Sequence, residues 1–282
     1  MNISIGMIAL NEAEFIEKNL TQHYEWNGGN VHQIIVVEGA VKEYPKKNIT
    51  KNGLSTDGTG EIIRNFMKYN DPEHKIYYVC GKWKDKTEQR NQYINLIDKK
   101  TDVLIVIDCD EFYPKSQQKL ISNAIEMFPQ KDSFEVPIVN LWHRQDLQVQ
   151  GSYWNVPHLK VYRWYEGSCY GEHHAQLING SRNFHTRDEK YQCLPYIRMI
   201  HYGYCRNQTY IQDKCQYYIN RGETKTRPIY VTARGDYFTW KEGMTTLSNG
   251  VNVISYDGVL PECFVENKEN CYLEQEVATN EY

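Results

Sequence analysis

Two aspartates spaced one residue apart, Asp108 and Asp110, are the residues of this chain best placed to do chemistry. They follow five apolar residues, 103–107, a run typical of a buried strand in a covered parallel sheet. Ligands of such sheets bind outside the carboxyl ends of the strands. Two neighbouring carboxylates repel each other unless a cation neutralises them, and Mg²⁺ or Mn²⁺ with waters and a phosphate suits such a pair. The pattern predicts a metal site; the alternative is a helix cap or a loop acid.

The elements that must position this pair alternate between strand and helix up to residue 112. We expect strands over residues 3–10, 33–37, 75–80 and 103–107, and helices over residues 12–24, 61–69 and 86–97. A polar segment, residues 42–54, is rich in Lys, Pro, Asn and Gly and is predicted to be a surface loop. The alternation predicts an α/β fold with a mainly parallel sheet and flanking helices.

The second half of the chain is less regular and rich in aromatic residues. We expect a helix over residues 116–128, strands over 133–141 and 159–164 without an intervening helix, and an amphipathic helix over 207–221. Tyrosines are frequent between residues 191 and 218. A tyrosine ring suits a sugar or a wet interface, but packing is its commoner role.

Composition sets broad limits on function. The chain has 282 residues, a net charge of −4 and a pI near 6.2, which favours one substantial core and does not indicate a nucleic-acid binder. Its start lacks the basic region and apolar run of a signal peptide, and no stretch reaches the length of a transmembrane helix. Eight scattered cysteines form no C-x-x-C pair, so zinc ribbons and redox motifs are not expected. We therefore expect a cytoplasmic protein with reduced thiols.

Five short motifs, in this order, resemble a family 2 glycosyltransferase with the GT-A fold, a Rossmann-like domain. They are residues 8–12 (IALNE), 36–39 (VVEG), 55–59 (STDGT), 90–91 (RN) and 108–112 (DCDEF). The resemblance covers residues 1–115, which it implies to be the nucleotide-binding half of a GT-A domain over 1–205. Residues 116–205 would be the acceptor half, followed by a helical or irregular extension over 206–282.

The resemblance also implies roles for individual residues. Asp110 would bind the metal directly, and Asp108 would contact a metal-bound water or the ribose. The nucleotide pocket would be lined by Leu10, Asn11, Glu12, Glu38, Asp57, Arg90, Asp108 and Cys109. Imidazole is an acceptable ligand for Mn²⁺, so His174 or His201 is expected as a third ligand, although a structural hydrogen bond is the alternative for each.

The sequence departs from the family pattern at two places. The acidic motif after the second strand is split by the insertion at residues 42–54. Residues 171–174 (GEHH) resemble a Gly-x-x-His-Glu pattern, but Ala175 replaces the final Glu. An inverting enzyme needs a carboxylate to take the acceptor's proton. Glu172 is the first candidate and Asp146 the second, with Glu111 as an orienting residue, although a lone acid is more often a solvated surface group.

Three classes of function follow. The first is a metal-dependent, inverting glycosyltransferase of glycan biosynthesis that moves a sugar from a nucleotide-sugar, with UDP the expected nucleotide, to a hydroxyl of a carbohydrate or glycoconjugate. The second is a sugar-phosphate nucleotidyltransferase, but residues 11–14 (NEAE) would repel a triphosphate where such enzymes carry a basic Gly-rich loop. The third is a non-catalytic carbohydrate- or partner-binding module on the same fold. An oligomer with a tyrosine-rich interface is compatible with all three.

Overall fold

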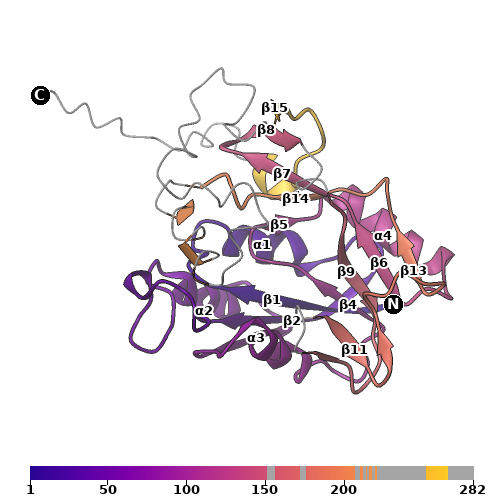
Figure 1. Cartoon of the computed structure of the whole chain (residues 1–282), viewed down its shortest axis with the longest axis horizontal. Coiled ribbons are helices and arrows are strands. Elements are labelled where there is room, and N and C mark those ends of the chain that lie inside the picture. Colours follow the sequence, from indigo (N-terminus) through magenta and orange to yellow (C-terminus); the bar gives the residue numbers. More distant parts are fainter. Residues whose placement is uncertain are drawn as a thin grey trace, which may run out of the picture.

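The central element of the molecule is a seven-stranded sheet in the order β13-β6-β9-β4-β1-β2-β3 (Figure 1). The computed structural model describes residues 1–150, 156–171, 176–206 and 252–265, and residues 210, 211, 214, 216, 217 and 220. Strands β1 (Asn2–Ala9), β2 (Asn30–Glu38), β3 (Ile76–Cys80) and β4 (Val103–Val106) pair in parallel. Strand β9 (His158–Arg163) runs antiparallel to β4 and to β6 (Ser133–Val136), and β13 (Tyr191–Cys193) pairs in parallel with β6. The predicted α/β fold with a mainly parallel sheet is confirmed.

Both faces of this sheet are covered, which explains the continuous apolar runs of its strands. Helices α1 (Ile16–Tyr24), α2 (Thr59–Tyr69) and α4 (Lys115–Met127) share one core cluster with Ile34 and Val36 of β2. The alternate residues Ile35 and Val37 belong to a second cluster with α3 (Lys86–Ile94). A three-stranded sheet packs on this second face and comprises β10 (Cys169–Tyr170), β11 (Leu177–Asn179) and β12 (Arg182–Asn183).

Helix α3 approaches β1 closely at a glycine. A Cβ atom at Gly6 would lie 2.6 Å from the ring of Tyr93, so only a residue without a side chain permits this contact. Tyr93 is fully buried, and its hydroxyl donates to the hydroxyl of Tyr170 at 2.7 Å. The glycine therefore fixes the distance between α3 and the carboxyl half of β1.

A second sheet, in the order β15-β8-β7-β14-β5, stands beyond α1 at the top of Figure 1. Its strands are β5 (Glu111–Phe112), β7 (Ile138–Trp142), β8 (Arg144–Gln150), β14 (Met199–His201) and β15 (Asn252–Ser255). An aromatic cluster that includes Phe15, Phe112 and Tyr202 packs this sheet against the start of α1. Phe264 of helix α6 (Glu262–Val265) stacks on Tyr202 with ring centroids 4.2 Å apart.

Several boundaries differ from the expectation. The single strand expected over residues 133–141 is wrong, because Pro137 lacks an N–H group and divides the run into β6 and β7, which belong to different sheets. The first helix begins at Ile16 rather than at residue 12, because residues 13–15 form turns that follow Asn11, whose φ is 55°. The predicted loop over residues 42–54 contains a short 3-10 helix, η1 (Lys46–Asn48).

The expected helix over residues 207–221 is described at six positions only, and all six are helical. The small strands β10 to β12 were not predicted, because two or three residues are too few to show a period. In the part of the chain that the structure describes, no helix combines the length and apolar character of a membrane span.

Candidate active site

The loops after β1, β2 and β4 meet at the carboxyl edge of the central sheet, where most of the predicted site residues lie. Leu10, which is half-buried, follows β1 directly. The backbone N–H of Gly39, after β2, donates to the carbonyl of Ala9 at 3.0 Å. The thiol of Cys109, after β4, donates to the carbonyl of Ile8 at 3.3 Å. These contacts make one continuous edge from three separate segments of sequence.

Helix α1 holds the loop that carries the aspartate pair. The amide of Asn19 donates to the carbonyls of Cys109 and Glu111 at 2.9 and 2.8 Å. Its own oxygen faces Nδ1 of His23 at 2.9 Å, and Nε2 of that ring accepts from the backbone N–H of Tyr113 at 3.2 Å. Burial lowers the pKa of His23 to about 3, so the ring is neutral. A neutral histidine and an asparagine thus fix the backbone under Asp108 and Asp110.

Asp110 is buried and surrounded by nitrogen atoms. Its Oδ2 atom lies 3.5 Å from Nε2 of His201, 3.7 Å from Nζ of Lys214 and 3.8 Å from Nη2 of Arg206. Burial opposes ionisation of the carboxyl, but these three neighbours together hold the pKa of Asp110 well below its ordinary value. Asp110 is therefore an anion at neutral pH.

The position of His201 follows from strand pairing. Strand β14 runs antiparallel to β5, with His201 opposite Glu111, and the backbone N–H of Tyr202 donates to the carbonyl of Asp110 at 2.8 Å. Nδ1 of His201 donates to Oδ1 of Asn140 on the neighbouring β7 at 2.6 Å. The imidazole is thereby oriented with Nε2 toward Asp110.

Asp108 is more open than its neighbour, with a third of its side chain exposed. Its Oδ2 atom lies 3.7 Å from Nζ of Lys160, while Oδ1 is buried and has no hydrogen-bond partner among the described residues. Lys160, on β9, also binds both carboxylate oxygens of Glu111, at 2.7 and 2.6 Å. Burial opposes the charge of Lys160, but Glu111 and Asp108 raise its pKa, so the ammonium persists.

Glu12 anchors a second ion pair at this edge. Its carboxylate accepts hydrogen bonds from Nη2 of Arg206 and, at 3.1 Å, from the hydroxyl of Tyr210. The guanidinium of Arg206 lies 4.4 Å from the centre of the Phe15 ring and 4.0 Å from that of Tyr210. Burial raises the pKa of Glu12 to about 7, despite the opposing attraction of Arg206. Residues after position 205 therefore reach the loop after β1.

The split acidic motif is reassembled in space. The backbone N–H of Ala40 donates to the carbonyl of Gly53 at 2.7 Å and closes the insertion at its base. Glu38 then accepts from the backbone N–H of Ser55 at 2.8 Å and from the hydroxyl of Tyr78. At Gly39, φ is 139° and a Cβ atom would lie 1.8 Å from the carbonyl oxygen of Gly81, so this close approach requires glycine.

Two of the predicted nucleotide-pocket residues, Asn11 and Asp57, form hydrogen bonds between the loop after β1 and the segment before α2. Asn11 donates through its backbone N–H to Oγ of Ser55 and accepts at Oδ1 from the N–H of Thr56, at 2.9 and 3.0 Å. Asp57 accepts from the backbone N–H groups of Ala13 and Thr59, at 2.9 and 3.0 Å. These contacts hold the start of α2 against the loop after β1.

The remaining predicted residues lie in different settings. Arg90, on α3, has its guanidinium 5.5 Å from the ring centre of Tyr170, and its Nε is buried without a hydrogen-bond partner in the described part of the chain. Cys109 is buried, and burial raises the pKa of its thiol well above the usual value. Asp146, on β8, is largely exposed and pairs with Arg144 at 2.9 Å. Glu172 and His174 lie outside the described residues.

Three basic residues of the site were missed by sequence reasoning: Lys160, Arg206 and Lys214. Lys160 interrupts an apolar strand, and a lysine in such a place signals a buried partner. Arg206 and Lys214 belong to the tyrosine-rich segment, where nothing local indicates that they face Asp110. Only the tertiary fold brings them there.

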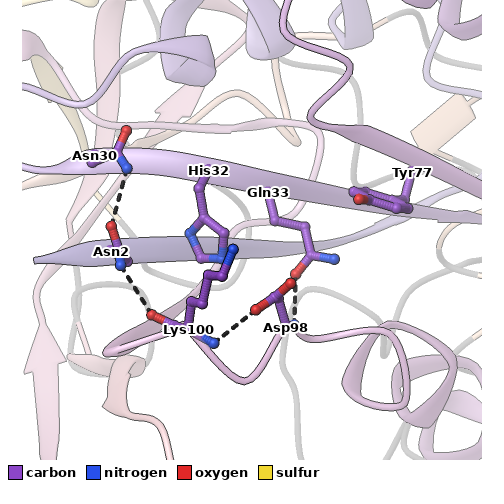
Figure 2. A pocket seen from close by; sticks show the side chains of 7 residues that line it. All are labelled: Asn2, Asn30, His32, Gln33, Tyr77, Asp98 and Lys100. Atoms are coloured by element: carbon purple, nitrogen blue, oxygen red, sulfur yellow. Dashed lines mark hydrogen bonds between the residues drawn. The ribbon is translucent and has the colours of Figure 1, made fainter.

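A hollow of about 370 Å³ lies at the other edge of the sheet, where β1 and β2 begin, and Figure 2 shows the side chains that line it. Asn30 donates to Asn2 at 3.0 Å, and Asn2 donates to the carbonyl of Lys100 at 3.1 Å. The hollow is lined by Asn2, Asn30, His32, Gln33, Tyr77, Asp98 and Lys100. It lies at the amino ends of parallel strands, opposite the edge at which such sheets bind their ligands.

The carboxyl edge has donor atoms for a divalent cation. Oδ2 of Asp110 and Nε2 of His201 are 3.5 Å apart, which lets one ion contact both atoms. A Cβ atom at Gly203 would lie 2.3 Å from Nε2 of His201, so only glycine permits the imidazole to lie this close to the backbone. Within the described residues no cluster of three or more His, Cys, Asp or Glu side chains is arranged as a complete metal site. The donors fit an ion that also takes oxygen ligands from water or phosphate.

Comparisons with known proteins give structural likeness only. No protein-family model matches the chain, and no curated protein matches its sequence. A mannosyltransferase from Pyrobaculum calidifontis, solved with GDP-Man and Mn²⁺, is 15% identical, with a TM-score of 0.47 and coverage of 78% of this chain and 63% of that one. S. aureus TarS 1-349 with UDP-GlcNAc is 14% identical, with a TM-score of 0.37 and coverage of 50% and 35%.

A protein described as a synthase is also similar. The 4-diphosphocytidyl-2C-methyl-D-erythritol synthase from Anaerococcus prevotii is 11% identical, with a TM-score of 0.36 and coverage of 58% of this chain and 70% of that one. The chain spans about a third of the TarS fragment and under two thirds of the mannosyltransferase. These likenesses concern the α/β fold, so we draw the functional proposal from the site itself.

Proposed function

We propose that the chain is a metal-dependent glycosyltransferase that moves a sugar from a nucleotide-sugar, UDP being the expected nucleotide, to an acceptor hydroxyl with inversion. The observation that carries the proposal is the pairing of Asp110 with His201 at the carboxyl edge, two residues after Asp108, whose Oδ1 is buried and has no hydrogen-bond partner among the described residues. An anionic oxygen, an imidazole nitrogen and a spare carboxylate oxygen at a strand end suit an ion that binds a diphosphate.

In the proposed reaction, Asp110 and His201 would hold Mn²⁺ or Mg²⁺, and Asp108 would bind a water of that ion or the ribose. When bound, the ion neutralises the charge that develops on the leaving diphosphate. The loops at residues 10–12, 38–40 and 55–57 form the proposed nucleoside pocket, and Arg90 is proposed to contact the donor. Asn19 and His23 keep the aspartate loop fixed while the charge moves, because both are bonded within the core.

The acceptor's proton needs a base, and we propose Glu172 for that role with Asp146 as the second choice. Asp146 is exposed and its carboxylate is bound to Arg144 in the structure. In a transfer assay, Glu172→Gln should then lower kcat, while Asp146→Asn should not.

The test of the function is a titration of UDP and GDP with Mn²⁺ and with a chelator, on wild type, Asp110→Asn and Asp98→Asn. We expect one nucleotide to bind wild type and Asp98→Asn in a Mn²⁺-dependent way, and Asp110→Asn to lose at least about tenfold in affinity, or about 1.4 kcal/mol. Asp98, in the hollow of the opposite edge, is the matched control. If neither nucleotide binds the wild type with Mn²⁺, the proposal is wrong.

A further inference from the structure

Oδ2 of Asp110 is flanked by three nitrogens and tightly bonded to none of them. The distances to His201, Lys214 and Arg206 are 3.5, 3.7 and 3.8 Å, longer than an ordinary N–H···O bond of about 2.7–3.2 Å. The three side chains therefore compensate the charge of this oxygen without taking it in a short hydrogen bond.

The two permanent cations beside Asp110 differ in how firmly they are held. Arg206 is nearly fully buried, pairs with Glu12 and lies between the rings of Phe15 and Tyr210. Lys214 keeps a fifth of its side chain exposed, and its Nζ lies 5.0 Å from the ring centre of Tyr204. A lysine also carries its charge on a flexible four-carbon stem, whereas the guanidinium is a rigid fork. Lys214 is thus the cation that can change partner.

Lys214 also lies next to the two atoms proposed to hold the metal, with Nζ 3.7 Å from Oδ2 of Asp110. A Cβ atom at Gly203 would be 2.3 Å from Nε2 of His201 and 2.7 Å from Nζ of Lys214, so both nitrogens pack against this glycine. A divalent ion bound to Asp110 and His201 would lie close to the ammonium of Lys214 and would repel it, because both carry positive charge. The ammonium then needs a new anionic partner close by.

The segment that carries Lys214 lies along the carboxyl edge. Tyr210 contacts Glu12 after β1, Tyr217 packs 6.0 Å from the ring of Tyr44 in the loop after β2, and Asn220 donates to the carbonyl of Glu43 at 2.9 Å. Lys214 therefore lies on a segment whose neighbours contact the loops after β1 and β2, where the proposed function places the donor.

We propose that Lys214 is a diphosphate-binding residue. In the free protein its ammonium compensates Asp110, and when a divalent cation takes Asp110 the ammonium passes to a phosphate oxygen of the donor and neutralises the leaving group. The exchange involves ion pairs only, with no covalent step. This inference rests on the proposed function and adds a residue and an order of events to it.

The experiment compares Lys214→Met, which keeps the length and removes the charge, with Lys214→Arg and with Lys99→Met, an exposed lysine paired with Glu166. Calorimetry measures UDP, GDP and the free nucleosides in the presence of Mn²⁺, and electron paramagnetic resonance measures Mn²⁺ alone. Thermal unfolding confirms that each variant is folded.

We expect Lys214→Met to weaken binding of the diphosphate at least about tenfold, equivalent to about 1.4 kcal/mol, and to leave the nucleoside unchanged. Mn²⁺ alone should bind this variant more tightly, because a competing cation is gone. Lys214→Arg should lose less than Lys214→Met, because it keeps a cation at position 214 although on a more rigid group. Lys99→Met should stay within about threefold of wild type for the diphosphate, because it leaves Lys214 in place.

Two results would overturn the inference. Unchanged diphosphate affinity in a folded Lys214→Met variant would show that the ammonium does not reach the phosphates. An equal loss for diphosphate and nucleoside, or weaker binding of Mn²⁺ alone, would show that Lys214 only supports the local structure. Failure of the wild type to bind either diphosphate is a different outcome, since it contradicts the proposed function itself.

Discussion

The two edges of the central sheet are built from the same strands and differ in how their polar groups are satisfied. At the amino edge, Asn2 and Asn30 bond to each other, and Asp98 accepts from the backbone N–H of Lys100. At the carboxyl edge, buried carboxylates face basic side chains: Glu12, Asp108, Asp110 and Glu111 lie near Arg206, Lys160 and Lys214. The charged residues at the amino edge, Asp98 and Lys100, are exposed, whereas those at the carboxyl edge form a largely buried network of charges.

This difference is the physical reason for placing the proposed function at the carboxyl edge. Buried ion pairs contribute little net stability, since desolvation offsets most of the attraction. A fold alone would be served as well by apolar residues at the carboxyl edge. The charges at that edge are therefore better explained by binding and chemistry, and the comparison can be tested by removing charges from each edge.

The largest effect on stability is expected for Lys160→Met. This change leaves the buried carboxylate of Glu111 without the ammonium that binds both of its oxygens, at a cost of about 3–5 kcal/mol in the free energy of unfolding. Urea denaturation would measure the loss as a lower midpoint with an unchanged m value.

The double variant Lys160→Met/Glu111→Gln is the control for this prediction. Removing both charges should recover most of the loss, because no uncompensated carboxylate remains. If the single and double variants are equally destabilised, the effect comes from packing of the lysine stem and not from charge.

The next effect is a pH dependence of the free energy of unfolding, which we expect from the buried His23. His23 has a pKa of about 3 in the folded protein and 6.5 as its ordinary value, because it is buried and accepts a backbone hydrogen bond at Nε2. Between these values the unfolded chain binds a proton that the folded chain does not. His23 should therefore reduce stability by about 1.4 kcal/mol for each pH unit as pH falls from 6.5.

Comparison of wild type with His23→Gln across pH 7 to 4 isolates this contribution. Glutamine does not titrate, so the difference in unfolding free energy between the two proteins should shrink on acidification. A difference that is constant with pH would contradict the neutral, buried histidine.

The smallest effect is expected at the amino edge. Lys100 lines the hollow of Figure 2 and is exposed, so Lys100→Met should change the free energy of unfolding by no more than about 0.5 kcal/mol. Nucleotide affinity should be unchanged as well. A clear loss of nucleotide binding in this variant would mean that the amino edge takes part in function, and the contrast between the edges would fail.

The first half of the fold was predictable because its strands and helices are long enough to show a regular spacing of apolar residues. Residues 103–107 are buried and form β4 within one residue, and the helix after position 60 was found from its apolar spacing. The second half was less predictable. Pro137 divides one apolar run into two strands that belong to different sheets. Strands of two or three residues are too short to show an alternation of apolar and polar residues.

Part of the site was predictable for a related reason. Asp108, Asp110 and Glu12 follow strands, so their meeting at one edge is a consequence of parallel topology. The structure also brings His201 beside Asp110, as its proposed role as a ligand requires. Lys160, Arg206 and Lys214 come from far along the chain, and their approach to the carboxylates depends on tertiary packing that no local spacing encodes.

The pairing of β14 with β5 has a consequence for how this protein can vary in length. His201 stands opposite Glu111 in a ladder, so an insertion or deletion of one residue within 199–201 would turn the imidazole to the other face of the strand and away from Asp110. The turn between β11 and β12, with Gly180 at a φ of 54° and open space around it, carries no such constraint. Related chains should therefore gain or lose residues freely at that turn while keeping the register of β14 unchanged.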